Sequence, residues 1–151
     1  MSADFDKGWF FVYKIILYLF AVYEGVYVIL NILALTRATS GLGIYLLFIL
    51  EPFIVLVFVV FEILAMKNKD VKKAKTALYG FAGYALLLVL CIILVLVGNF
   101  TAEWKTATSI DLIINLILLL VFIVYGAFQV YKALGGSVPA TANVYSAYNN
   151  A

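Results

Sequence analysis

Four long apolar stretches, separated by short polar segments, dominate the hydropathy pattern of this chain. A helix of about 20 apolar residues crosses the roughly 30 Å of hydrocarbon in a bilayer, and each stretch is long enough to do so. The stretches are residues 9–35, 43–66, 77–97 and 110–134. The pattern predicts an all-α fold, an integral membrane four-helix bundle that forms one domain over residues 1–151.

The segments between these stretches predict how the helices are arranged. Short connections at 36–42, 67–76 and 98–109 favour neighbouring helices that run in opposite directions. One side of such an antiparallel bundle carries Lys7, Lys67, Lys69, Lys72, Lys73, Lys75 and Lys132, whereas the other side carries Arg37 and Lys105. Because basic residues are enriched in cytoplasmic loops, we expect both termini, and the tail at 135–151, in the cytoplasm. We also expect this uncharged tail to pack on something, such as a neighbouring copy.

Composition narrows the chemistry that the chain can perform. It is 67% hydrophobic and 12% charged, whereas soluble domains have roughly 25% charged residues. It contains no histidine, which excludes imidazole catalysis and imidazole ligation of zinc or haem. The single cysteine, Cys91, stands in an apolar run typical of a small buried hydrophobe. We therefore predict no enzymatic activity, metal site, cofactor or nucleic-acid partner.

Ionisable residues inside the apolar stretches are the candidates for a site, since each costs about 2.5–3.5 kcal/mol near the middle of a spanning helix. Counted from the inner ends of their helices, Glu24, Glu51 and Asn115 fall at similar depth. We predict that they form a mid-membrane polar cluster. Two facing carboxyls do not both ionise readily, which favours a shared proton. Such a cluster is either structural glue or a proton or cation site.

A second pair of charged residues lies nearer the inner end. Lys14 in the first stretch and Glu62 in the second fall at similar depth on neighbouring helices. We predict an inner-interface salt bridge between them. In the alternative, Lys14 extends alone to the lipid headgroups, as long basic side chains near helix ends do.

Small residues indicate where helix backbones approach closely. They are Ala21 and Gly25 in the first stretch, and Ala77, Gly80 and Gly83 in the third. Because the third stretch has no ionisable residue, we expect it to face lipid or another copy of the chain.

Lysines around the middle connection are candidates for contact with anionic headgroups of the cytoplasmic leaflet, at about 1 kcal/mol for each lysine near the surface. They are Lys67, Lys69, Lys72, Lys73 and Lys75. Membrane lipids are therefore one predicted class of partner, and further copies or other membrane subunits are the second.

Four spans, cytoplasmic termini, short loops and aromatic-rich helices resemble the broad tetraspan class that includes MARVEL-domain proteins. The resemblance is one of architecture and covers the whole chain. Our leading hypothesis is a structural membrane protein that associates with itself to scaffold or shape membrane. The alternatives are an accessory transmembrane subunit of a larger complex, and proton or cation transport through the mid-membrane carboxylates.

Overall fold

The computed structural model describes residues 4–39 and 42–136, and the regular structure in this part of the chain is helical. The elements are α1 (Gly8–Arg37), α2 (Leu42–Asn68), α3 (Val71–Val97), α4 (Ala102–Leu118), η1 (Leu119–Val124) and α5 (Tyr125–Ala133). The last three are continuous and form one long helix. Four helices are thus long and apolar enough to cross a membrane, which confirms the predicted number of spans. The predicted packing of the tail is not tested, because residues 137–151 lie outside the part of the chain that the structure describes.

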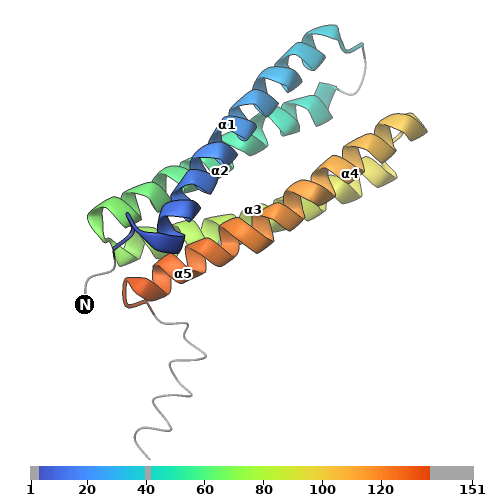
Figure 1. Cartoon of the computed structure of the whole chain (residues 1–151). Coiled ribbons are helices and arrows are strands. Elements are labelled where there is room, and N and C mark those ends of the chain that lie inside the picture. The colour runs from blue at the N-terminus through green and yellow to red at the C-terminus, as the bar shows by residue number, and fades with distance from the viewer. Residues whose placement is uncertain (1–3, 40–41, 137–151) are drawn as a thin grey trace, which may run out of the picture.

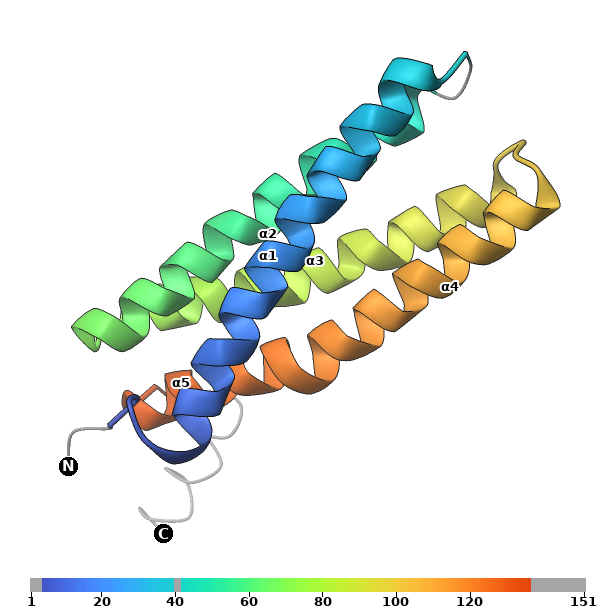
Figure 2. The same ribbon diagram turned by 45° about the horizontal axis from the view of Figure 1, so that its top comes forward.

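The four long helices are arranged as two pairs, α1 with α2 and α3 with the α4–η1–α5 helix (Figure 1). The pairs contact each other mainly through α2 and α3. They lie close together at the end that carries the N-terminus and diverge toward the C-terminal ends of α1 and α3 (Figure 2). The described part of the chain is therefore wider at one end than at the other.

The third helix lies at the centre of this arrangement. It packs against α2, α4, η1 and α5, and 33% of its most apolar window is buried, against 22% for α1. The third helix is therefore the most buried of the four rather than the most exposed, although Leu86, Leu90 and Ile93 are still exposed on it. The absence of charge in this stretch did not reveal its burial, because a helix packed among other helices and a helix that faces lipid both have apolar surroundings.

Two helices begin earlier than the hydropathy pattern predicts. α3 begins at Val71 and α4 at Ala102, within segments that we expected to be connections. Asp70 caps α3, since its carboxylate accepts hydrogen bonds from the backbone amides two and three residues later, at 2.9 and 3.3 Å. Thr101 caps α4 with a 3.4 Å bond from the amide three residues later. These side chains satisfy amides that a helix start leaves without intrahelical partners.

A single left-handed residue makes the turn from α2 into α3. Lys69 has a φ of +52°, and no other non-glycine residue of the described chain has a positive φ. The Asp70 amide donates to the Ala65 carbonyl at 3.0 Å, the bond expected when a helix ends in a Schellman motif. Glycine or asparagine usually occupies this position, because other residues in left-handed geometry cost roughly 1–2 kcal/mol.

The last long helix widens into π geometry at η1, where α1 contacts it. The Tyr13 hydroxyl of α1 donates to the Ile123 carbonyl in η1 at 3.3 Å. The Tyr13 ring lies directly against Gly126, so that a β-carbon at Gly126 would collide with it. Widened turns of this kind occur where a side chain enters the helical hydrogen-bond ladder. Tyr13 and Gly126 together fix the approach of α1 to this helix.

Candidate functional site: a buried polar cluster

One polar side chain from each spanning helix meets in the interior of the bundle. Glu24 of α1, Glu51 of α2, Tyr84 of α3 and Asn115 of α4 are all buried. The Tyr84 hydroxyl lies 2.5 Å from Glu51 Oε1 and 3.5 Å from Glu24 Oε1. The Asn115 amide interacts with both Glu24 and Tyr84. We call these four residues the polar clasp.

The clasp has an unequal distribution of hydrogen-bond donors. A tyrosine hydroxyl has one hydrogen, and the shorter distance gives this hydrogen to Glu51. The second contact of this hydroxyl, toward Glu24 at 3.5 Å, is longer and therefore weaker. The shared proton expected for two neighbouring carboxyls stays a prediction.

Cys91 extends the clasp on the side of Glu51. Its thiol lies 3.6 Å from Glu51 Oε2, so both oxygens of Glu51 have a donor. By contrast, Glu24 Oε2 is buried without a hydrogen-bond partner in the part of the chain that the structure describes. Tyr84 and Cys91 are two helical turns apart on one face of α3. Sequence reasoning missed both roles, because a phenol and a thiol within an apolar run have no distinctive pattern.

A groove leads from the surface to the clasp between α1 and α4. It has a volume of about 460 Å³, and its walls are apolar except for Tyr23, Asp111 and Asn115. The Tyr23 hydroxyl donates to Asp111 at 3.4 Å, which ties the two helices together at the rim. Through Asn115 the groove reaches the interior cluster.

Lys14 and Glu62 do not form the predicted salt bridge. The Lys14 ammonium instead contacts the Asp6 carboxylate at 2.5 Å. Glu62 is fully buried, and neither of its oxygens has a hydrogen-bond partner among the described residues. Its polar neighbour is Tyr13, whose hydroxyl hydrogen goes to a backbone carbonyl. The sequence paired Lys14 with Glu62 by their depth along neighbouring helices, and it did not predict that the N-terminal segment returns to Lys14.

The predicted packing residues divide into two kinds. They are Ala21, Gly25, Ala77, Gly80 and Gly83. Ala77 is fully buried, and Gly80 packs so closely on the Phe58 ring of α2 that a β-carbon would collide with it. A β-carbon at Gly25 or at Gly83 would meet no atom within 4 Å, and Ala21 is half-buried. Close packing within the chain thus uses Ala77 and Gly80, whereas Gly25 and Gly83 have open space beside them.

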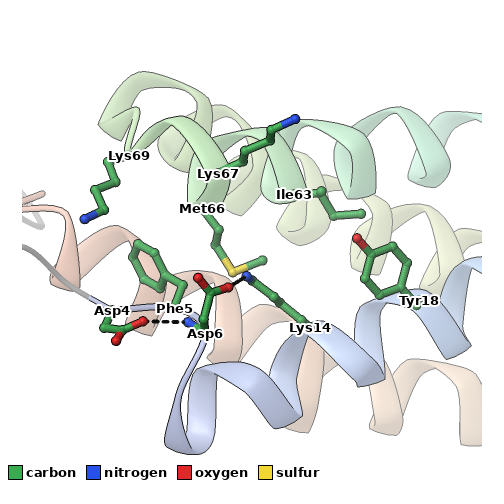
Figure 3. Close-up of a pocket in the computed structure, with 9 residues that line it drawn as sticks. All are labelled: Asp4, Phe5, Asp6, Lys14, Tyr18, Ile63, Met66, Lys67 and Lys69. Atoms are coloured by element: carbon green, nitrogen blue, oxygen red, sulfur yellow. Dashed lines mark hydrogen bonds and ion pairs between the residues drawn. The ribbon is translucent and has the colours of Figure 1, made fainter.

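The predicted lipid-contact lysines also separate. Lys67 and Lys69 line a pocket at the N-terminal end of the bundle (Figure 3). Lys73 pairs with Asp70 at 2.9 Å, and the Lys75 ammonium lies over the Tyr79 ring, 5.9 Å from its centre. Lys72 is exposed on the first turn of α3.

Within residues 4–39 and 42–136, no three histidine, cysteine or acidic residues come close enough together to hold a metal ion. No protein-family model, no curated protein and no solved structure matches the chain. The function is therefore inferred from contacts within the chain.

Proposed function

We propose that the chain is a non-enzymatic structural membrane protein, and that copies of it associate to scaffold or shape a membrane. The observation that supports this proposal is the polar clasp. In lipid, apolar burial does not drive helices together, so that close packing and interhelical hydrogen bonds must do so. Each spanning helix contributes one residue to the clasp. The clasp therefore connects all four helices.

In this proposal the helices cross the bilayer as an antiparallel bundle with both termini in the cytoplasm. The lysines near the N-terminus and the α2–α3 turn support this orientation, because basic residues favour the cytoplasmic side. The same lysines are then placed to contact anionic headgroups of that leaflet. Further copies of the chain, or other membrane subunits, are the proposed protein partners.

Two features favour a role in shaping or scaffolding. The helix pairs diverge toward the C-terminal ends of α1 and α3 (Figure 2), and a protein that is wider in one leaflet than in the other displaces more lipid there and favours curvature. Gly25 and Gly83 have open space beside them, and small residues at a helix surface let a neighbouring helix approach closely.

Purification in mild detergent, followed by cross-linking, tests self-association. We expect homo-oligomers, and a lower oligomer fraction for Gly83→Leu without a loss of thermal stability. Leu86→Phe, at another exposed position of α3, is the matched control and should leave the oligomer unchanged. A chain that remains monomeric contradicts the proposal. Stoichiometric purification with unlike chains and without self-association supports the accessory-subunit alternative instead.

Proton or cation transport is the second candidate, with Glu24 and Glu51 as the site and Asn115 as a neutral ligand. The unpartnered buried oxygens of Glu24 and Glu62 favour it. Glu51 and Glu62 are, however, separated by about 16 Å along α2, so any proton route needs water between them. Flux into proteoliposomes should be abolished in the Glu24→Gln, Glu51→Gln double variant. Flux that survives both substitutions rules out this mechanism.

A further inference from the structure

Two adjoining pockets meet at the Tyr23–Asp111 hydrogen bond, on the side of the bundle where α1 faces α4. One is the groove of about 460 Å³ described above, and the other, of about 300 Å³, continues along α1 past Val26, Tyr27, Leu30 and Asn31. Both pockets have Tyr23 and Asp111 in their walls, and we call them together the α1–α4 groove. α1 contacts the last long helix at η1 and α5 and lies apart from α4 beyond these contacts (Figure 2). Volumes of this order are usual for small-ligand sites.

Asp111 is the charged residue of this groove, and nothing in the described chain neutralises it. It accepts the 3.4 Å hydrogen bond from Tyr23, but a neutral phenol does not compensate a negative charge. No lysine or arginine among the described residues forms an ion pair with Asp111, and none lines either pocket. An ionisable group within a membrane span is costly unless it has a partner or a function. The Asp111 carboxylate is therefore available to a cation that enters the groove.

A second carboxyl lies behind the wall of the groove. Asn115 lines the groove and interacts with Glu24, whose Oε2 is buried without a hydrogen-bond partner among the described residues. Glu24 and Asp111 also interact electrostatically, and like charges repel strongly where water is excluded. A positive charge in the groove would be attracted by both carboxyls when they are ionised and would reduce the repulsion between them.

The remainder of the lining suits an organic cation with an apolar chain. The rings of Tyr23 and Tyr27 are 19° from parallel, with their centres 6.3 Å apart, and the faces of tyrosine rings attract ammonium groups. On the other side of Asp111 the walls are aliphatic and aromatic, and they include Leu19, Phe20, Ile114, Leu118 and Phe122. A ligand that fills the groove would therefore hold its positive charge beside Asp111 and its apolar part along these residues.

We propose that the α1–α4 groove binds a lipophilic organic cation, an amine or quaternary ammonium compound with one alkyl chain. Its nitrogen lies against the Asp111 carboxylate and the Tyr23 ring, and its chain lies between Leu19 of α1 and Leu118 of α4. A choline phospholipid fits less well, because its phosphate would lie beside Asp111 with no basic residue in the described lining to pair with. Such binding requires neither self-association, nor a particular orientation in the membrane, nor transport through the clasp.

Native mass spectrometry of the full chain in dodecyl maltoside tests the ligand class. This detergent has a neutral headgroup and a dodecyl chain, so it competes for the apolar walls in every measurement. Dodecyltrimethylammonium, added far below its micellar concentration, should bind about tenfold more tightly than dodecyl sulfate, because one charge-assisted contact distinguishes them. The net charge of the chain, +2, would by itself favour the anion. Equal binding, or tighter binding of the sulfate, overturns the proposal. So does phosphatidylcholine that binds as tightly as dodecyltrimethylammonium, because the site would then be one for a lipid headgroup.

Variants of single lining residues locate the site. Asp111→Asn keeps an acceptor for Tyr23 but removes the charge, and it should weaken binding of dodecyltrimethylammonium about tenfold. Leu118→Trp fills the groove from an exposed position and should weaken binding without a change of charge. Glu103→Gln is the matched control, an exposed acid of the same helix that lines neither pocket. Undiminished binding by either lining variant overturns the proposal, as does an equal loss with Glu103→Gln. The two lining variants change different properties, so one suffices if thermal melting shows the other to be unfolded.

Discussion

The Tyr84 hydroxyl donates to the Glu51 carboxyl at 2.5 Å in the centre of the bundle, which joins α3 to α2 through a buried hydrogen bond. The same oxygen lies 3.5 Å from Glu24, so one phenol links three helices. Tyr84 is therefore the residue on which the clasp most depends.

Tyr84→Phe should lower the free energy of unfolding by about 1–3 kcal/mol, because the buried Glu51 carboxyl loses its closest donor. Thermal unfolding in detergent measures the effect. The control is Tyr79→Phe, which removes a hydroxyl from an exposed position of the same helix and should change stability by less than about 0.5 kcal/mol. If the two variants behave alike, the clasp does not stabilise the bundle.

Two substitutions of Glu51 separate its shape from its charge. Glu51→Gln keeps an oxygen that can accept from Tyr84 and should cost less than about 1 kcal/mol, by analogy with an ordinary hydrogen bond. Glu51→Ala leaves the Cys91 thiol without an acceptor and the phenol with only its longer contact to Glu24, and it opens a cavity, at about 2–5 kcal/mol. Chemical denaturation of both variants in the same micelle checks the order. The reverse order would mean that the negative charge itself is required.

Glu62 should be replaceable by an apolar residue with a gain in stability. Both of its oxygens are buried without a partner in the described chain, and the penalty for such groups is about 1–3 kcal/mol. Glu62→Met should therefore raise the thermal midpoint, whereas Glu103→Met, in the exposed first turn of α4, should leave it unchanged. A lower midpoint for Glu62→Met would show that the native carboxyl has a bound water or ion as a partner.

Gly126→Ala should destabilise the contact between α1 and the last long helix. The added methyl group collides with the buried Tyr13 ring, and overpacking of this kind costs about 1–3 kcal/mol. Gly83→Ala is the matched control, since its methyl group meets no atom within 4 Å and alanine favours a helix by up to about 1 kcal/mol. Thermal midpoints that move in opposite directions for the two variants satisfy this prediction.

The cap of α3 should be sensitive to acid. The Lys73 ammonium, and then the backbone amides, hold the pKa of Asp70 below its usual 3.8. Its stabilising contribution is therefore complete above the unfolded-state pKa and is lost as pH falls below about 4 through the folded-state value. Asp70→Asn keeps a capping side chain but cannot titrate. Thermal midpoints measured from pH 6 to pH 2 should fall less for this variant than for the unsubstituted chain.

The sequence was sufficient for the number of spans and for relative depth, because length and hydropathy are properties of each helix alone. Glu24, Glu51 and Asn115 were assigned a common level on that basis, and the structure brings their side chains together. The direction in which a side chain faces depends on its neighbours, which is why Lys14 and Glu62 were paired incorrectly. Tyr84 was missed for a related reason, since its hydroxyl becomes a link only once two carboxyls lie beside it.

The position of Cys91 provides a way to follow motions of the bundle without introducing a reactive residue by mutation. It is the only cysteine in the chain, it is fully buried, and it lies beside Glu51. A membrane-permeant maleimide can reach this thiol only when the surrounding helices separate. The rate of alkylation, followed over hours in intact vesicles, thus measures how often the native protein opens. Comparison with the Tyr84→Phe variant would give the contribution of one hydroxyl group to that opening frequency.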